Sequence, residues 1–181
     1  MKAILPLLAT SLFLSVVSPA QTCREVVRDS SGRVVQTVET RKSGSGTASI
    51  TRDASGRVVG TSTSQSSKGG STSTTYRDAS GRVAGSATTN GSSAGSSKTT
   101  YLDGSGRVAG SATTRTNGTS GSRTGFRDAS GRSAGSQATN GSSGSVTGTS
   151  RDTSGRVIGS STGSGKCPSV PHVPSPPTVV K

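Results

Sequence analysis

The chain is poor in the residues that build a hydrophobic core. It has no tryptophan, two tyrosines and two phenylalanines, so aromatic residues make up 2% of its 181 residues. Leu, Ile, Val and Phe total 15 of the 147 residues from 21 to 167, which is about 10% and below the roughly 20% under which chains tend to be disordered. We therefore expect no conventional globular core, and order has to come from backbone ladders, stacked side chains or self-assembly.

Proline is absent from residues 21–167, and the only histidine is His172. Because proline removes ladder hydrogen bonds, its absence over so long a stretch favours β-structure over a random linker. A helix is not expected, since Ser, Thr and Gly dominate and no 3.6-residue apolar period appears. Five prolines gather in residues 168–181, which predicts a disordered, extended, polyproline-like tail.

Residues 1–20 have the organisation of a secretory signal peptide. An apolar run from Ile4 to Val17 precedes small residues, Ser18 and Ala20, at positions −3 and −1 of a cleavage site before Gln21. The run is shorter than the roughly 20 residues of a membrane span. We expect an exported chain in the periplasm, at the cell surface or outside the cell, with no transmembrane segment after signal removal.

Two cysteines, Cys23 and Cys167, flank the central region. In an oxidising compartment such a pair predicts a disulfide. Within one chain it would close a loop of about 140 residues and contribute roughly 4–5 kcal/mol in loop-entropy models. A straight solenoid would keep the two ends apart, and a bridge between chains is then the alternative. Lipidation of Cys23 is disfavoured, because Ala20 and Thr22 stand where a lipoprotein signal has Leu and a small residue.

What fills the central region is a short motif, Asp-x-Ser-Gly-Arg, that recurs every 24 or 25 residues. Its copies are Asp29–Arg33, Asp53–Arg57, Asp78–Arg82, Asp103–Arg107, Asp128–Arg132 and Asp152–Arg156. The glycines of these copies are Gly32, Gly56, Gly81, Gly106, Gly131 and Gly155. So regular a period is typical of a repeat array. The predicted domains are a signal peptide at 1–20, a six-repeat array at 21–167 and the tail at 168–181.

Each motif predicts a turn between two strands. Its Asp can accept hydrogen bonds from the following backbone, and its Gly can take a positive φ. Thr- and Tyr-rich stretches before the motif and Val-containing stretches after it favour strands, and Asn90-Gly91 is a favoured hairpin dipeptide. The predicted fold is an all-β repeat of six strand–turn–strand units of about 25 residues, in a hairpin meander or a solenoid, with room for substantial disorder.

Aligning the copies produces columns with distinct physical properties. Two residues before the Asp stand Val27, Thr51, Tyr76, Tyr101, Phe126 and Ser150. Directly after the motif Arg stand Val34, Val58, Val83, Val108, Ser133 and Val157. Stacked units would pack these columns as a thin apolar stripe and pair the Arg and Asp columns as charged ladders. A glycine column, Gly60, Gly85, Gly110, Gly135 and Gly159, would allow a bulge or a close backbone approach.

The core D-x-x-G-R-V with an aromatic residue upstream resembles the YD repeat of Rhs-type proteins, and Tyr76–Val83 is the best match. Arg77 stands where the second Tyr of that repeat belongs, and the chain is too short to enclose a cargo domain as Rhs shells do. The chain also looks like short secreted bacterial proteins built from RDxSGRxxG repeats. These resemblances imply β-hairpin units in an extended sheet on an exported bacterial protein.

The sequence contains no catalytic constellation and predicts no enzyme, no cofactor and no metal site. Calcium repeats need several acidic or amide ligands per site, whereas each motif Asp has Arg close by, so capping of the turn is the better interpretation. Without the signal, 20 Lys plus Arg against 8 Asp plus Glu leave a net charge of +12. Anionic polysaccharides or envelope surfaces are therefore candidate partners, while aromatics are too few for a specific nucleic-acid platform.

These observations predict a secreted, non-enzymatic structural or adhesive repeat protein of the bacterial surface or extracellular matrix, with self-association as a further option. The alternative is a largely disordered basic protein that binds anionic envelope polymers.

Overall fold

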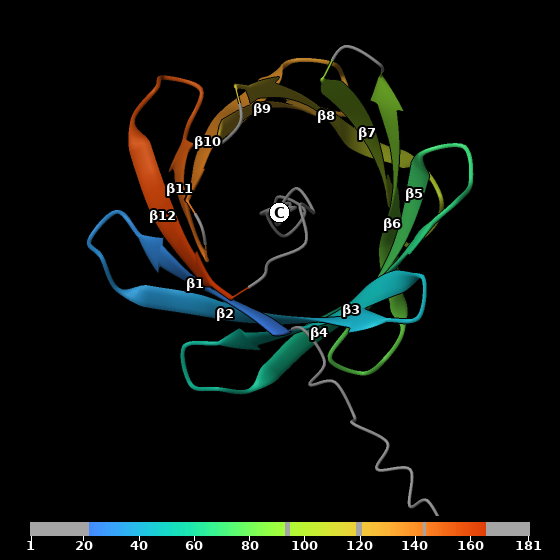
Figure 1. The fold of residues 1–181 in the computed structure, drawn as a ribbon, viewed down its shortest axis with the longest axis horizontal. Helices are drawn as coiled ribbons and strands as arrows, with labels where there is room; N and C mark the ends of the chain where they lie inside the picture. Colours follow the sequence, from blue (N-terminus) through green and yellow to red (C-terminus); the bar gives the residue numbers. More distant parts are fainter. Residues whose placement is uncertain (1–21, 93–94, 119–120, 143, 166–181) are drawn as a thin grey trace, which may run out of the picture.

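The computed structural model describes residues 22–92, 95–118, 121–142 and 144–165, which form an all-β structure (Figure 1). Its strands are β1 (Thr22–Asp29), β2 (Val34–Ser43), β3 (Gly46–Asp53), β4 (Val58–Ser66), β5 (Ser71–Asp78), β6 (Val83–Ser92), β7 (Ser96–Asp103), β8 (Val108–Asn117), β9 (Gly121–Asp128), β10 (Ser133–Ser142), β11 (Ser145–Arg151) and β12 (Val157–Ser164). Each strand pairs antiparallel with its neighbours in sequence, so the chain is a hairpin meander.

The meander closes into a barrel, because β1 pairs with β12 from Arg24↔Ser164 to Asp29↔Gly159. The expected solenoid is therefore wrong, and the meander is right. The physical reason is that antiparallel hairpins twist and curl, and joining the first strand to the last satisfies the backbone groups that two open edges would leave unpaired. Closure also brings the two ends of the array side by side.

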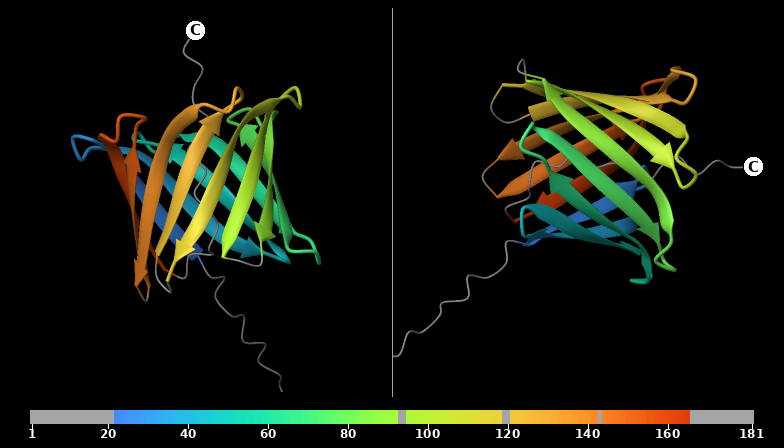
Figure 2. Two further views of the ribbon diagram at one scale, coloured as in Figure 1. Left: turned by 90° about the horizontal axis from the view of Figure 1, so that it is seen from above. Right: turned by 90° about the vertical axis from the view of Figure 1, so that its right-hand side faces the viewer.

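The strands are inclined to the barrel axis, as the two side views show (Figure 2). Strands about 4.8 Å apart and tilted by about 40° give a twelve-stranded barrel a backbone diameter of about 24 Å. The described part of the chain contains no helix with the length and apolar character needed to cross a membrane.

The motif turns are closed by the hydrogen bonds that the sequence predicts. In the first, Asp29 N–H donates to the Arg33 carbonyl at 2.9 Å, and Gly32 N–H donates to the Asp29 carbonyl at 3.1 Å. The Asp29 Oδ1 accepts from the N–H groups of Ser31 at 2.8 Å and Arg33 at 3.0 Å. Gly32 has a φ of 80°, the left-handed conformation that glycine adopts without steric cost. The other five copies repeat this pattern.

A β-bulge follows each motif turn, and the glycine column stands beside five of the six bulges, while Gln36 takes this place in the first hairpin. In the third hairpin Tyr76 pairs with Gly85 but Arg77 pairs with Val83, so Ala84 is left over. A Cβ on Gly85 would lie 2.5 Å from the Leu102 carbonyl oxygen on the neighbouring strand, a separation that no side chain tolerates. The predicted close backbone approach and bulge are both present, and they recur in the other hairpins that carry this glycine.

Alternate residues of every strand face the barrel interior, and this inner wall is lined mainly by small polar side chains. The buried residues other than glycine all belong to this inward set: Cys23, Ser64, Thr74, Ala87, Thr99, Ala112, Thr124, Gln137 and Ser161. Hydroxyl pairs cross between neighbouring strands, for example Ser64 Oγ to Thr74 Oγ1 and Thr89 Oγ1 to Thr99 Oγ1, both at 2.8 Å. Order in this protein thus rests on backbone ladders and hydroxyl contacts rather than on a packed apolar core.

Candidate functional site

The motif turns all lie at the same end of the barrel. Each of them joins an odd-numbered strand to the following even-numbered strand, and in an antiparallel meander such connections share one rim. We call this end the motif rim and define it by residues 28–35, 52–59, 77–84, 102–109, 127–134 and 151–158. The sequence predicted the turns, but only the closed topology shows that they form a ring.

Two arginine columns at the motif rim have different roles. The Arg before the Asp clamps its turn, since Arg28 Nη1 donates to the Gly32 carbonyl at 2.9 Å. Equivalent bonds come from Arg52, Arg77, Arg127 and Arg151. Leu102 replaces this Arg in the fourth turn.

The second column consists of the motif arginines Arg33, Arg57, Arg82, Arg107, Arg132 and Arg156. All of them are exposed. Within the described residues, none of their guanidinium groups is engaged in an ion pair or hydrogen bond. The expected Arg–Asp charge ladders are therefore not formed here, because the carboxylates bind backbone N–H groups instead. Six guanidinium groups remain available to a ligand.

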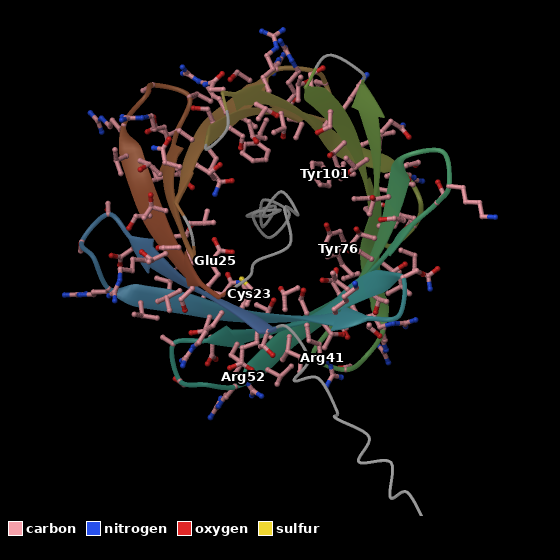
Figure 3. The ribbon with its side chains drawn as sticks, viewed as in Figure 1. Cys23, Glu25, Arg41, Arg52, Tyr76 and Tyr101 are labelled. Carbon is pink, nitrogen blue, oxygen red and sulfur yellow. The ribbon has the colours of Figure 1, made fainter. Side chains whose placement is uncertain are left out.

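The valine column that was expected to pack between repeats is instead exposed at this rim. Val83 is 48% exposed and Val108 is 55% exposed. Val34, Val58 and Val157, at equivalent places, are exposed as well. The reason is that this column pairs with the residues before the motif Asp, as Val58 does with Arg52, which lies outside the ring (Figure 3). The motif rim therefore alternates cationic and apolar side chains, with eleven arginines and six aspartates in total.

Three aromatic residues form an arc on the inner wall, near the motif rim. Tyr76 (β5), Tyr101 (β7) and Phe126 (β9) share one column and are only partly exposed. Figure 3 shows Tyr76 and Tyr101 on the inner side of the ring, together with Cys23, while Arg52 lies outside. Burial raises the pKa of Tyr101 to about 12. Burial and the neighbouring Tyr101 raise the pKa of Tyr76 further. We call these three residues the aromatic arc.

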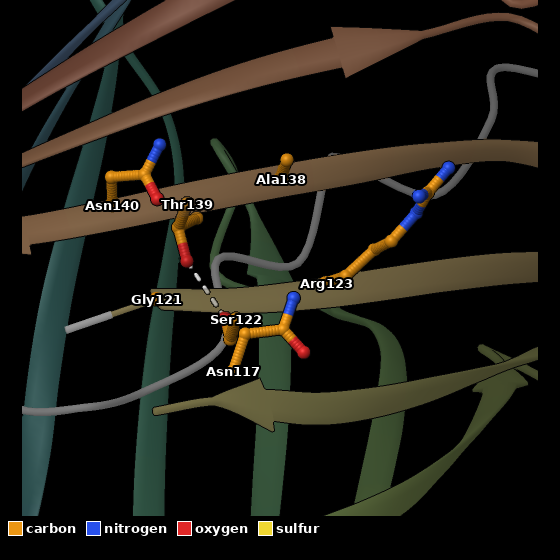
Figure 4. Close-up of a pocket in the computed structure, with 7 residues that line it drawn as sticks. All are labelled: Asn117, Gly121, Ser122, Arg123, Ala138, Thr139 and Asn140. Atoms are coloured by element: carbon orange, nitrogen blue, oxygen red, sulfur yellow. Dashed lines mark hydrogen bonds between the residues drawn. The ribbon is translucent and has the colours of Figure 1, made fainter. Parts of the chain in front are cut away.

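A hollow of about 420 Å³ lies between β8, β9 and β10, at the end opposite the motif rim (Figure 4). Its lining residues are Asn117, Gly121, Ser122, Arg123, Ala138, Thr139 and Asn140. Ser122 Oγ and Thr139 Oγ1 form a hydrogen bond of 2.7 Å with each other. The lining offers amide, hydroxyl and guanidinium groups, which can make hydrogen bonds to a polar ligand.

The motif aspartates do not come together into a cation site. The described residues contain no group of three or more His, Cys, Asp or Glu side chains that could hold a metal ion. Each Asp caps its own turn, and closure spreads the six carboxylates around the rim.

Several predicted features lie outside the described residues: the signal peptide at 1–20, Cys167 and the tail at 168–181 with His172. Cys23 is buried on the inner wall, with 6% of its surface exposed. Its disulfide with Cys167 stays a prediction. Closure of the barrel removes the objection that the two ends of the array lie too far apart for a bridge within one chain.

No family model, curated protein or solved structure matches this chain.

Proposed function

We propose that this chain is an exported, non-enzymatic adhesive protein that binds an acidic polymer of the bacterial surface or matrix through its motif rim. Each hairpin closed by a motif turn is one of six equivalent units, and each unit presents one binding arginine. The same proposal includes kinship with short secreted RDxSGRxxG-repeat proteins and a distant kinship with YD repeats.

The observation that carries the proposal is the ring of six exposed motif arginines whose guanidinium groups are not engaged by the rest of the turn. Guanidinium groups bind carboxylate, sulfate and phosphate groups in a bidentate manner. On a ring of about 24 Å diameter, six equivalent positions lie about 12 Å apart. A flexible polyanion can contact several of them at once, so that weak single contacts combine into a strong overall affinity.

An adhesive role fits this architecture better than polymerisation through sheet edges. Polymerisation of the meander would require a free edge strand, whereas β1 and β12 pair with each other. The alternative of a largely disordered basic chain does not fit residues 22–164, most of which lie in strands. The anionic polymers that this alternative would bind are also the ligands proposed for the motif rim.

The proposal can be tested with residues 21–181 and alginate, a polyuronate, with neutral dextran as the comparison polymer. Calorimetry at increasing NaCl should show alginate binding that weakens with salt, because bound counterions are released, and no dextran binding. Replacing the six motif arginines with Gln should weaken alginate binding on the order of 100-fold, through loss of multivalency. The fold should be retained, since these side chains make no hydrogen bond or ion pair with the described residues.

A matched control removes six other exposed cations: Arg24, Arg41, Lys68, Lys98, Arg115 and Arg123. The two variants have the same net charge, and circular dichroism would verify that both keep the β-fold. We expect the control to lose no more than about threefold in affinity, since it leaves the ring intact. Equal losses in the two variants would show that net charge, not the motif rim, governs binding.

A further inference from the structure

The aromatic arc has the construction of a site for a polyproline II chain. Between Tyr76 and Tyr101 the wall contains only Gly85 and Ala87 facing inward, as the pairings Tyr76↔Gly85 and Ala87↔Tyr101 show. Gly110 and Ala112 separate Tyr101 from Phe126 in the same way. The three rings therefore rise above two furrows of small residues. Grooves lined by aromatic rings are the surfaces on which proline-rich segments dock.

The chain contains such a segment, directly after the last strand. In a polyproline II helix, which has three residues per turn, residues 168–181 would present three faces. One face consists of Pro168, Pro171, Pro174 and Pro177, and the next of Val170, Val173, Pro176 and Val179. The third face is polar and consists of Ser169, His172, Ser175 and Thr178. Two apolar faces and one polar face are the pattern of a segment that packs against a surface.

The starting point of this segment also favours the interior. The described chain ends at Gly165, whose Cα lies so near β1 that a Cβ there would be 2.5 Å from the Thr22 carbonyl oxygen. The next residue of β1, Cys23, faces the interior (Figure 3). If the predicted disulfide with Cys167 forms, it holds the residue before Pro168 against the inner wall, at the end opposite the motif rim.

The length of the segment is sufficient to reach the aromatic arc. Fourteen residues at about 3.1 Å each span about 43 Å as a polyproline II helix. Tyr101 stands five residues into β7, about 17 Å from the end where the segment starts, and the barrel is about 24 Å across. The direct path is therefore about 30 Å. Attachment to the barrel also gives the segment a high effective concentration.

We propose that the aromatic arc is a binding site for proline-rich chain in the polyproline II conformation, and that its occupant is the protein's own segment 168–181. The two apolar faces of the segment pack on the rings and in the furrows, and the polar face contacts the hydroxyl groups of the inner wall. This site is separate from the motif rim, so it does not depend on the proposed anion binding.

The chain carries its own reporter for this site, because its only two tyrosines both belong to the arc and it has no tryptophan. Quenching of tyrosine fluorescence by acrylamide therefore measures access to the arc alone. In residues 21–181 with Pro168, Pro171, Pro174 and Pro177 all replaced by Ala, we expect quenching at least twice as efficient as in the unaltered chain. This variant keeps the length of the tail and both cysteines.

Two further variants make the test specific. Replacing Ser169, His172 and Ser175 with Ala alters only the polar face and should leave quenching unchanged. Phe126→Ala removes one ring without touching either reporter and should raise quenching in the chain with an unaltered tail but not in the four-proline variant. Equal quenching in the unaltered and four-proline chains would overturn the proposal. Protection that rises with protein concentration would overturn the intramolecular part, since it would place the tail of a second copy in the site.

Discussion

The two ends of the barrel carry the same net charge in two different arrangements. The motif rim has eleven arginines and six aspartates, a net charge of +5. The opposite half has seven described cations, Arg24, Arg41, Lys42, Lys68, Lys98, Arg115 and Arg123, against Glu25 and Glu39, again a net charge of +5. At the motif rim the same turn recurs six times, whereas the opposite turns vary in length and composition. Charge alone therefore does not distinguish a binding face in this protein, but periodic placement does.

The motif end is also the part of the molecule that backbone geometry specifies most tightly. Its turns share one hydrogen-bond pattern, its glycines share one φ near 80°, and its bulges share one register. At the opposite end the turn at Ser67 has the same two backbone bonds, to the Ser71 carbonyl at 2.8 Å and from Gly70 N–H at 3.2 Å, but Ser67 replaces the Asp, and its hydroxyl donates to the Ser71 carbonyl instead of accepting from N–H groups. Changes in the turns and bulges of the motif end should consequently cost more than changes in the opposite turns, and the following predictions test that difference in order of expected effect.

The largest effect is expected in the glycine column. Gly110→Ala would bring a Cβ to 2.5 Å from the Arg127 carbonyl oxygen, and the resulting backbone shift should destabilise the fold by about 1–3 kcal/mol. Gly69→Ala, at the opposite end, meets nothing within 4 Å and should change stability by less than about 1 kcal/mol. Thermal unfolding followed by circular dichroism measures both. Similar melting temperatures for the two variants would show that substitutions cost no more at the motif end than in the opposite turns.

A smaller effect is expected from the turn carboxylates. Asp78→Ala removes the acceptor of the Ser80 and Arg82 N–H groups, bonds of 2.8 and 3.0 Å, and should cost about 1–2 kcal/mol. Asp78→Asn keeps an acceptor oxygen and should recover most of that loss. Ser67→Ala at the opposite end loses one longer bond of 3.2 Å and should stay within about 0.5 kcal/mol. Urea unfolding curves would rank the three variants, and a Ser67 cost equal to that of Asp78 would contradict the ranking.

The smallest effect is expected for the bond from the Arg before the motif Asp to the motif Gly carbonyl, which the fourth turn lacks because Leu102 replaces that Arg. Leu102→Arg would give the fourth turn the bond to the Gly106 carbonyl that its equivalents make, and Arg77→Leu would remove such a bond of 2.9 Å. Arg77 is exposed and Leu102 is partly exposed, so each change should be worth only a few tenths of a kcal/mol. Amide hydrogen exchange within the two turns is sensitive enough, with slower exchange expected for Leu102→Arg and faster exchange for Arg77→Leu. If both variants changed the exchange rate in the same direction, the stabilising role of this Arg bond would be refuted.

Local features of the fold were predictable because neighbouring residues fix them. Asp29 and Gly32 specify their turn by hydrogen bonding and by backbone freedom. Features that depend on contacts between distant residues were not predictable. Val83 was expected to be packed and is exposed, and the Arg–Asp ladders expected between repeats are not formed among the described residues, although the aspartates cap their turns as predicted.

By itself, the sequence determined the all-β character and the positions of the motif turns, since hydrogen bonds and steric limits within a few residues decide these. Only the tertiary structure decided that β1 meets β12, that the six motif turns form one ring and that Tyr76, Tyr101 and Phe126 form an arc on the inner wall. The physical reason is that closure depends on the summed twist and register of twelve strands, a property that no single repeat contains.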